Sequence, residues 1–194
     1  VMRLANQVER RVCTYGLSAE FDFVAKDIEI YNHQSFYTLY VDRQEVGRVT
    51  LPLPGIHMVK NSLASLAVAR ELDIKVEKAC VNLSTFKGVA RRAELLADKN
   101  GIQVIDDYGH HPTEIRQTLL AIRTSMIHDG TKSKRLRVVF QPHRYSRTKE
   151  LFSEFLTVFD ACDQLFVLPI YAAGEKAIEG ISSEVLTDAI LHPI

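Results

Sequence analysis

A short apolar segment that runs directly into a loop of charged and aromatic residues, and then into a helical pattern, most limits how this chain can fold. Residues 102–105 (IQVI) suit a buried strand, and apolar residues recur at helical spacing from Thr113 to Ile127. Between them the sequence reads DDYGHHP, and Pro112 suits the first turn of a helix. A strand, a polar loop and a helix in this order predict an α/β sheet, in which ligands bind at the carboxyl ends of the strands.

The loop from Asp106 to Pro112, called the acidic loop below, has two interpretations. An isolated pair of aspartates is more often part of an acidic surface turn. Charged side chains that directly follow a buried strand instead favour a functional loop, because such loops are held by a rigid sheet.

A second polar loop follows a second apolar segment. Residues 136–140 (LRVVF) suit a strand, and they are followed by QPHRYSRT, residues 141–148, called the arginine loop below. If this turn opens a helix, Arg144 and Arg147 lie on one side of it beside free backbone amides. Such a site suits a carboxylate or a phosphate.

The alternative for the arginine loop is a solvated basic turn. In that case Arg144 and Arg147 would pair with Glu150 or Glu154, a few residues further along the same segment. Two polar loops at the ends of two strands of one sheet favour the functional interpretation.

The rest of the chain divides into two blocks. Short alternating segments from Asp22 to Thr50 predict an antiparallel meander. Helices are expected over Asn61–Leu72 and Val76–Thr85, and residues 84–92 form an irregular linker with Gly88 as a plausible hinge. Strands and helices alternate after the linker, which is typical of a parallel sheet.

Charge and cysteine content exclude several classes of protein. Lys and Arg together number 24, as do Asp and Glu, so no overall field favours nucleic acid or an anionic membrane. The three cysteines form no C-x-x-C pair, so neither a disulfide framework nor a zinc knuckle is expected, and a reducing cytoplasm fits. No apolar stretch approaches the ~20 residues of a membrane helix. No metal site is expected, because metal-ligand spacing is absent among His57, His110, His111 and His143.

Several strings together resemble the Mur ligase family of bacterial peptidoglycan synthesis. They are DDYGHHPTEI and VVFQPHRYSRT, followed by YAAGE at 171–175, with GIHMVKNSLAS at 55–65 and FKGVARR at 86–92. Within the family, the closest resemblance is to the member that joins L-alanine to UDP-N-acetylmuramate through an acyl phosphate. The resemblance implies the end of the central ATPase domain over residues 1–86 and a Rossmann-like C-terminal domain over residues 87–194. It also implies ATP and Mg²⁺, small-molecule substrates and a bacterial cytoplasmic location, and it leaves the oligomeric state open.

The family's phosphate loop is missing from this sequence. No G-x-x-x-x-G-K-[ST] string occurs, although its glycines and lysine are what hold the β- and γ-phosphates. In the family that loop and the Mg²⁺ ligands precede the segment that this chain matches. The chain is therefore expected to be the C-terminal part of a longer ligase and to be inactive alone.

The resemblance assigns four residues to ATP. Asp107 matches the aspartate that holds the ribose hydroxyls, and Arg92 matches the arginine near the phosphates, which is also expected to act in catalysis. His57 and Asn61 match residues around the adenine. Met58 stands where the family usually has Asn, so one polar contact to the base is lost.

For the amino acid, the resemblance assigns Tyr108, His110, Arg144 and Arg147 to the pocket, with His143 adjacent. An arginine pair can hold an α-carboxylate through bidentate hydrogen bonds. His110 either accepts or steers the proton of the amine, as a catalytic group, or merely orients Asp107.

His111 is expected to be structural, either capping a helix or packing under the acidic loop. Two functional alternatives stay open. One is a peptidoglycan-recycling ligase that attaches a tripeptide to the same nucleotide, although the QPHRYSRT string favours free L-alanine. The other is a nucleotide-sensing or partner-binding module without catalysis.

Overall fold

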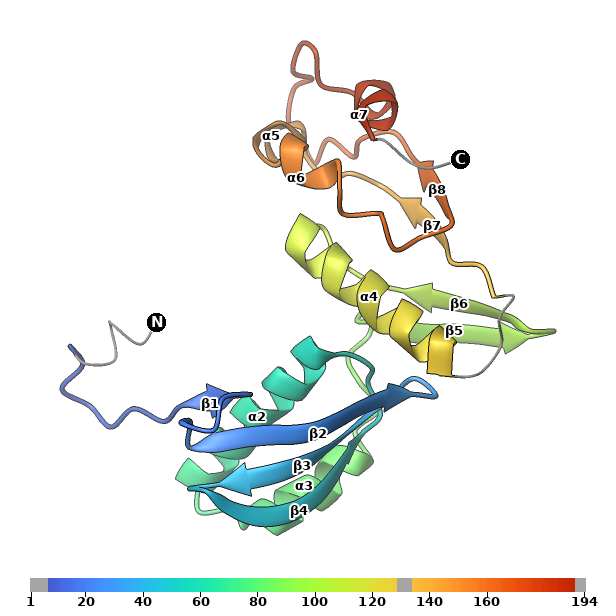
Figure 1. Cartoon of the computed structure of the whole chain (residues 1–194). Coiled ribbons are helices and arrows are strands. Elements are labelled where there is room, and N and C mark those ends of the chain that lie inside the picture. The colour runs from blue at the N-terminus through green and yellow to red at the C-terminus, as the bar shows by residue number, and fades with distance from the viewer. Residues whose placement is uncertain (1–6, 129–133, 191–194) are drawn as a thin grey trace. The chain divides into compact units, whose positions relative to one another are not determined.

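The computed structural model describes residues 7–128 and 134–190 (Figure 1). It divides into two compact units, Val1–Gly88 and Val89–Ile194, called the N-terminal and C-terminal units. The architecture is mixed α/β, as predicted. Within the described residues, no helix is both long enough and apolar enough to span a membrane.

The N-terminal unit is a four-stranded sheet with two helices packed against it (Figure 1). Strands β2, β3 and β4 form the predicted antiparallel meander, and β1 pairs with β2 in parallel. The β2–β3 turn is tight because Asn32 and His33 adopt positive φ angles of 49° and 56°. The elements are β1 (Tyr15–Gly16), β2 (Phe23–Tyr31), β3 (Gln34–Val41), β4 (Gln44–Leu51), α2 (Ile56–Glu71) and α3 (Val76–Ser84).

The core of the N-terminal unit lies between α2 and the sheet. Val59, Leu63 and Leu66 recur at helical spacing on α2 and are buried against the sheet residues Phe23 and Leu39. Burial of each such side chain stabilises the fold by about 1.5–3 kcal/mol. This packing explains why α2 forms over a sequence without a side-chain cap at its first turn.

A buried hydroxyl pair ties α2 to β3. The hydroxyl of Tyr37, which is fully buried, lies 2.7 Å from the Oγ of Ser62. Burial raises the pKa of Tyr37 to about 12, so the phenol stays neutral and can donate this bond.

Substitution of Tyr37 by Phe is expected to destabilise the protein by about 1–2 kcal/mol, because it removes a buried hydrogen bond without removing the ring. Tyr40→Phe is the matched control, since its hydroxyl bonds Glu45 at an exposed position. Urea unfolding of both variants measures the difference. Equal midpoints for the two variants would show that the Tyr37–Ser62 bond contributes nothing.

The C-terminal unit contains two separate strand pairs rather than the single alternating sheet predicted. Strand β6 pairs antiparallel with β5. Strand β7 pairs directly with β8 in parallel, and the chain between these two strands contains helices. The hairpin forms because Asn100 and Gly101, with φ angles of 54° and 76°, make a two-residue turn. The elements are β5 (Glu94–Lys99), β6 (Ile102–Asp106), α4 (Pro112–His128), β7 (Arg137–Phe140), α5 (Tyr145–Glu150), α6 (Phe152–Phe155), β8 (Gln164–Val167) and α7 (Ser183–Ala189).

Helix α4 anchors the C-terminal unit. Its residues Ile115 and Leu119 are buried in one core cluster with Phe140, Phe155 and Phe159. The acidic loop enters α4, and the arginine loop leaves β7 at Phe140. The same core therefore supports both loops.

Candidate functional site

The Asp107 carboxylate is fixed by backbone amides on both sides. Its Oδ1 accepts a hydrogen bond from the amide of Gly109 at 2.8 Å, and its Oδ2 accepts one from Ala93, also at 2.8 Å. A Cβ atom at Gly109 would lie 2.5 Å from Oδ1, so a larger residue at this position would displace the Asp107 carboxylate from its present position. Each carboxylate oxygen keeps a further lone pair for an outside donor such as a hydroxyl.

The segment around Arg92 lies beside the acidic loop. The amide of Tyr108 donates to the carbonyl of Arg91 at 2.6 Å. The guanidinium of Arg92 lies 5.8 Å from the centre of the Tyr108 ring and 3.8 Å from the carboxylate of Glu114. The structure thus brings together Arg92, Asp107 and Tyr108, which are three of the predicted site residues.

The start of α4 is capped from both directions. His111 precedes the helix, and its Nδ1 accepts a hydrogen bond from the amide of Thr113 at 3.2 Å. Glu114 reaches back to accept from the amides of His110 (3.2 Å) and His111 (3.4 Å). This is a capping-box arrangement. The capping role expected for His111 is confirmed.

Two opposing effects act on the pKa of Glu114. Partial burial would raise it, but the hydrogen bonds from His110 and His111, with the nearby charges of His110 and Arg92, outweigh burial and lower it. The carboxylate is therefore ionised at neutral pH. The sequence patterns alone assigned no role to Glu114.

The arginine loop has an unusual backbone conformation. Arg144 adopts a positive φ of 75° just before α5, and its amide donates to the carbonyl of Tyr171 at 2.8 Å. The amide of Tyr171 in turn bonds the carbonyl of Pro142 at 2.8 Å, and the rings of His143 and Tyr171 lie 5.1 Å apart. Pairing with the segment after β8 therefore holds a conformation that is costly for a non-glycine residue.

The carboxylate of Glu175, a residue from a later segment, bonds the first turn of α5. It accepts from the Ser146 amide at 3.0 Å and from the Ser146 hydroxyl at 2.6 Å. The hydroxyl bond is the largest of the effects that lower the pKa of Glu175. The expectation of free amides beside the arginines is thus wrong for Ser146, because a carboxylate from a distant segment already uses that amide.

The guanidinium groups of the arginine loop are not neutralised by the carboxylates that the alternative interpretation named. In the parts of the chain that the structure describes, neither Arg144 nor Arg147 forms an ion pair with Glu150 or Glu154. Arg147 donates to the carbonyl of His143 at 3.4 Å, and Arg144 is exposed. The carboxylate of Glu175 lies near enough for the charge of Arg144 to help lower its pKa, so it balances part of the positive charge of this loop.

The acidic loop and the strand that leads into the arginine loop lie close together. Asp107 and Gly109 of the acidic loop line one cavity together with Val139 and Phe140 at the end of β7. Within the arginine loop, partial burial and then the nearby charges of Arg147 and Arg144 lower the pKa of His143.

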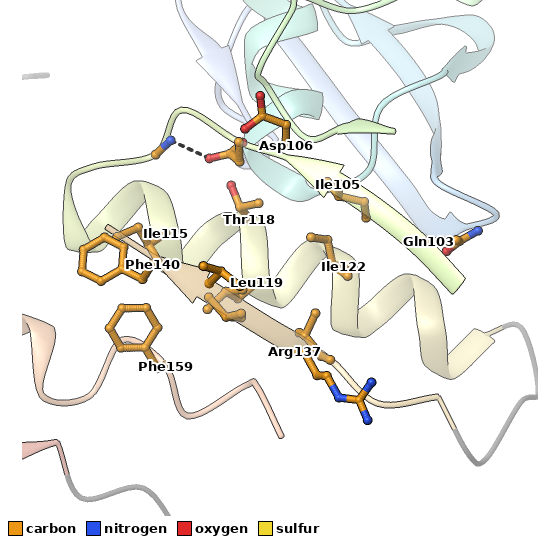
Figure 2. A pocket seen from close by; sticks show the side chains of 15 residues that line it. Gln103, Ile105, Asp106, Ile115, Thr118, Leu119, Ile122, Arg137, Phe140 and Phe159 are labelled. Atoms are coloured by element: carbon orange, nitrogen blue, oxygen red, sulfur yellow. Dashed lines mark hydrogen bonds between the residues drawn. The ribbon is translucent and has the colours of Figure 1, made fainter. Parts of the chain in front are cut away.

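A cavity of about 220 Å³ opens between β6, α4 and β7 (Figure 2). Ile105, Leu119 and Phe140 form apolar parts of its wall, and Asp106 and Thr118 are polar (Figure 2). Of the predicted site residues, Asp107 alone lines it. The residues predicted to bind the amino-acid substrate therefore do not line this cavity. No sequence pattern indicated the cavity.

His57 and Asn61 lie on α2 in the N-terminal unit, whereas the other predicted site residues belong to the C-terminal unit. They are four residues apart, so they share one face of the helix. The amide of Asn61 lies 3.9 Å from the sulfur of Met58. Over residues 7–128 and 134–190, no group of three potential metal ligands is present.

Two family models match this chain. The Mur ligase middle domain matches residues 1–69, and the glutamate ligase domain of Mur ligases matches residues 91–193.

Similar curated proteins carry a single name. A UDP-N-acetylmuramate--L-alanine ligase of Geotalea daltonii is 46% identical over 186 residues, which cover 94% of this chain and 39% of that protein. The protein of the same name from Desulforapulum autotrophicum is 44% identical over 190 residues, which cover 98% of this chain and 41% of that protein. The chain thus spans about two fifths of these relatives' length.

Solved structures show the same fold. A UDP-N-acetylmuramate-alanine ligase of Thermotoga maritima superposes with a TM-score of 0.72 at 22% identity, over 92% of this chain and 36% of that one. A MurF ligase from Thermotoga maritima in complex with ADP gives a TM-score of 0.67 at 22% identity, over 86% of this chain and 37% of that one.

Proposed function

Because this chain belongs to the Mur ligase family, we propose that it supplies nucleotide and amino-acid contacts to a cytoplasmic ligase that joins L-alanine to UDP-N-acetylmuramate at the expense of ATP. One observation carries the proposal: the acidic loop and the end of β7, from which the arginine loop leaves, line one cavity although they are distant in sequence. We place the boundary between the central and C-terminal domains between residues 86 and 87.

The nucleotide contacts are proposed for four residues. Asp107 accepts the ribose hydroxyls, which suits a carboxylate whose oxygens each keep a lone pair. Arg92 approaches the phosphates, while His57 and Asn61 lie at the adenine. The fixed position of Asp107 and the tether from Ala93 to its carboxylate support this arrangement, because they place the ribose acceptor beside Arg92.

The amino-acid contacts are proposed for five residues of the two loops. Arg144 and Arg147 hold the α-carboxylate, with Tyr108, His110 and His143 around the rest of the molecule. The absence of ion pairs from these arginines to Glu150 or Glu154, among the described residues, supports this role. Pocket size alone would set the selectivity, and an extra methylene is rejected by only about 1–3 kcal/mol, so glycine and serine should be accepted to some degree.

In the described part of this chain, no group of three potential metal ligands gathers that would hold a metal ion from this chain alone. ATP-dependent ligation requires cations beside the transferred phosphoryl group, and Arg92 provides only one of them. We therefore propose that the Mg²⁺ ligands and the phosphate loop come from a preceding part of the complete enzyme.

The complete enzyme containing this chain tests the proposal. Phosphate release that depends on both UDP-N-acetylmuramate and L-alanine is expected. Dependence on a tripeptide instead of L-alanine would establish the recycling ligase. Nucleotide binding without phosphate release from any amino acid or peptide would establish a non-catalytic module.

The isolated chain is expected neither to hydrolyse ATP nor to form an amide bond. The sequence has no phosphate loop, so transfer of the γ-phosphate would lack most of its charge stabilisation. Phosphate release from highly purified chain checks this, with the complete enzyme as positive control. Steady release above background would contradict it.

A further inference from the structure

Glu114 lies between a residue proposed for the nucleotide and one proposed for the amino acid. Its Oε1 is 3.8 Å from the guanidinium of Arg92, and its Oε2 is 3.7 Å from the Nδ1 of His110. The Nδ1 of His110 also lies 3.2 Å from the carbonyl of Tyr108. A single carboxylate thus contacts both halves of the site.

We propose that Glu114 is a positioning residue whose carboxylate holds Arg92 and His110 in one arrangement and so links the nucleotide contacts to the amino-acid contacts. The proposal rests on the proposed function, because it takes Arg92 and His110 to face ATP and the amino acid. Glu114 itself touches neither substrate. It acts through the two side chains beside it, Arg92 and His110.

Helix capping alone does not account for this geometry. The capping bonds come from the amides of His110 and His111, and both end on Oε2. A neutral glutamine has a carbonyl oxygen that can accept the same bonds. The approach of Arg92 to Oε1 depends on the negative charge. Capping and positioning can therefore be separated by substitution.

The test compares Glu114→Gln and Glu114→Ala in the complete enzyme. Glu114→Gln should keep the unfolding midpoint of the wild type, because capping survives, yet lower kcat about 10-fold or more and raise KM for both ATP and L-alanine. Small displacements of positioned groups have effects of this size. Glu114→Ala should lose stability as well. Glu114→Asp, which keeps the charge, should recover part of kcat.

Glu184→Gln is the matched control, because Glu184 also lies in the first turn of a helix, α7, where it is exposed and belongs to neither loop. This variant should retain wild-type kinetics. Double variants then separate the effect of Glu114 on Arg92 from its effect on His110. In an Arg92→Ala background, Glu114→Gln should no longer raise KM for ATP, and in a His110→Ala background it should no longer raise KM for L-alanine.

Two results overturn the inference. One is wild-type kinetics for Glu114→Gln together with lost stability in Glu114→Ala, which leaves capping as the only role. The other is strict additivity in both double variants. The proposed function fails separately, because in that case the wild-type complete enzyme itself would not use L-alanine.

Discussion

Replacement of Arg144 or Arg147 by Ala in the complete enzyme is expected to raise KM for L-alanine by roughly 30- to 1,000-fold, with little change in KM for ATP. Loss of one arm of a desolvated carboxylate clamp costs about 2–4 kcal/mol, because the substrate carboxylate is left partly unpaired. Neither arginine pairs with Glu150 or Glu154 in the described structure, so the substitution should act on ligand binding. Initial rates at saturating partner substrate measure both KM values.

Lysine at either arginine position should restore binding only in part, since an ammonium group cannot reproduce the planar fork. Lys149→Ala is the matched control, because Lys149 is an exposed cation on the same helix, α5. It should leave both KM values unchanged. If KM for ATP rises while KM for L-alanine does not, the arginine loop binds phosphate. The proposal that this loop binds the amino acid is then wrong.

Asp107→Ala is expected to raise KM for ATP by roughly 10- to 100-fold, since hydrogen bonds to a charged group each contribute about 1.5–3 kcal/mol. Ribose contacts are nearly equal in the ground and transition states, so kcat should change less. Arg92→Ala should lower kcat as well, because charge near the transferred phosphoryl group redistributes during reaction. Steady-state kinetics with varied ATP distinguish the two patterns.

The structure adds a complication for Asp107. Its carboxylate also holds the amides of Ala93 and Gly109, so Ala would loosen the acidic loop. Asp107→Asn keeps one oxygen acceptor and provides the cleaner variant, while Asp98→Ala, an exposed aspartate on β5, serves as the control. A normal KM for ATP in both Asp107 variants would exclude this residue as the ribose ligand.

Local sequence patterns determined most of the elements that carry the site. The apolar residues 102–105 form β6, but Ile102 and Val104 are exposed, so the expectation of a buried strand is wrong. The helical spacing after Pro112 forms α4, and the alternation from Asp22 to Thr50 forms the meander. These signals succeed because they depend on periodicity and turn residues within a few positions. The hairpin of β5 and β6 was missed, although Asn100-Gly101 is the usual sign of such a turn.

Long-range contacts decided the rest. Only the tertiary structure showed that the acidic loop and the end of β7 line one cavity, that Glu175 accepts from the amide of Ser146, and that Glu114 lies between Arg92 and His110. It also left β6 paired with β5 alone among the described strands. Such contacts depend on how the core around α4 and Phe140 places distant segments, and no local pattern records that placement. The sequence alone determined which residue types the two loops contain. Packing of distant segments determined which of these residues form ion pairs or hydrogen bonds with one another.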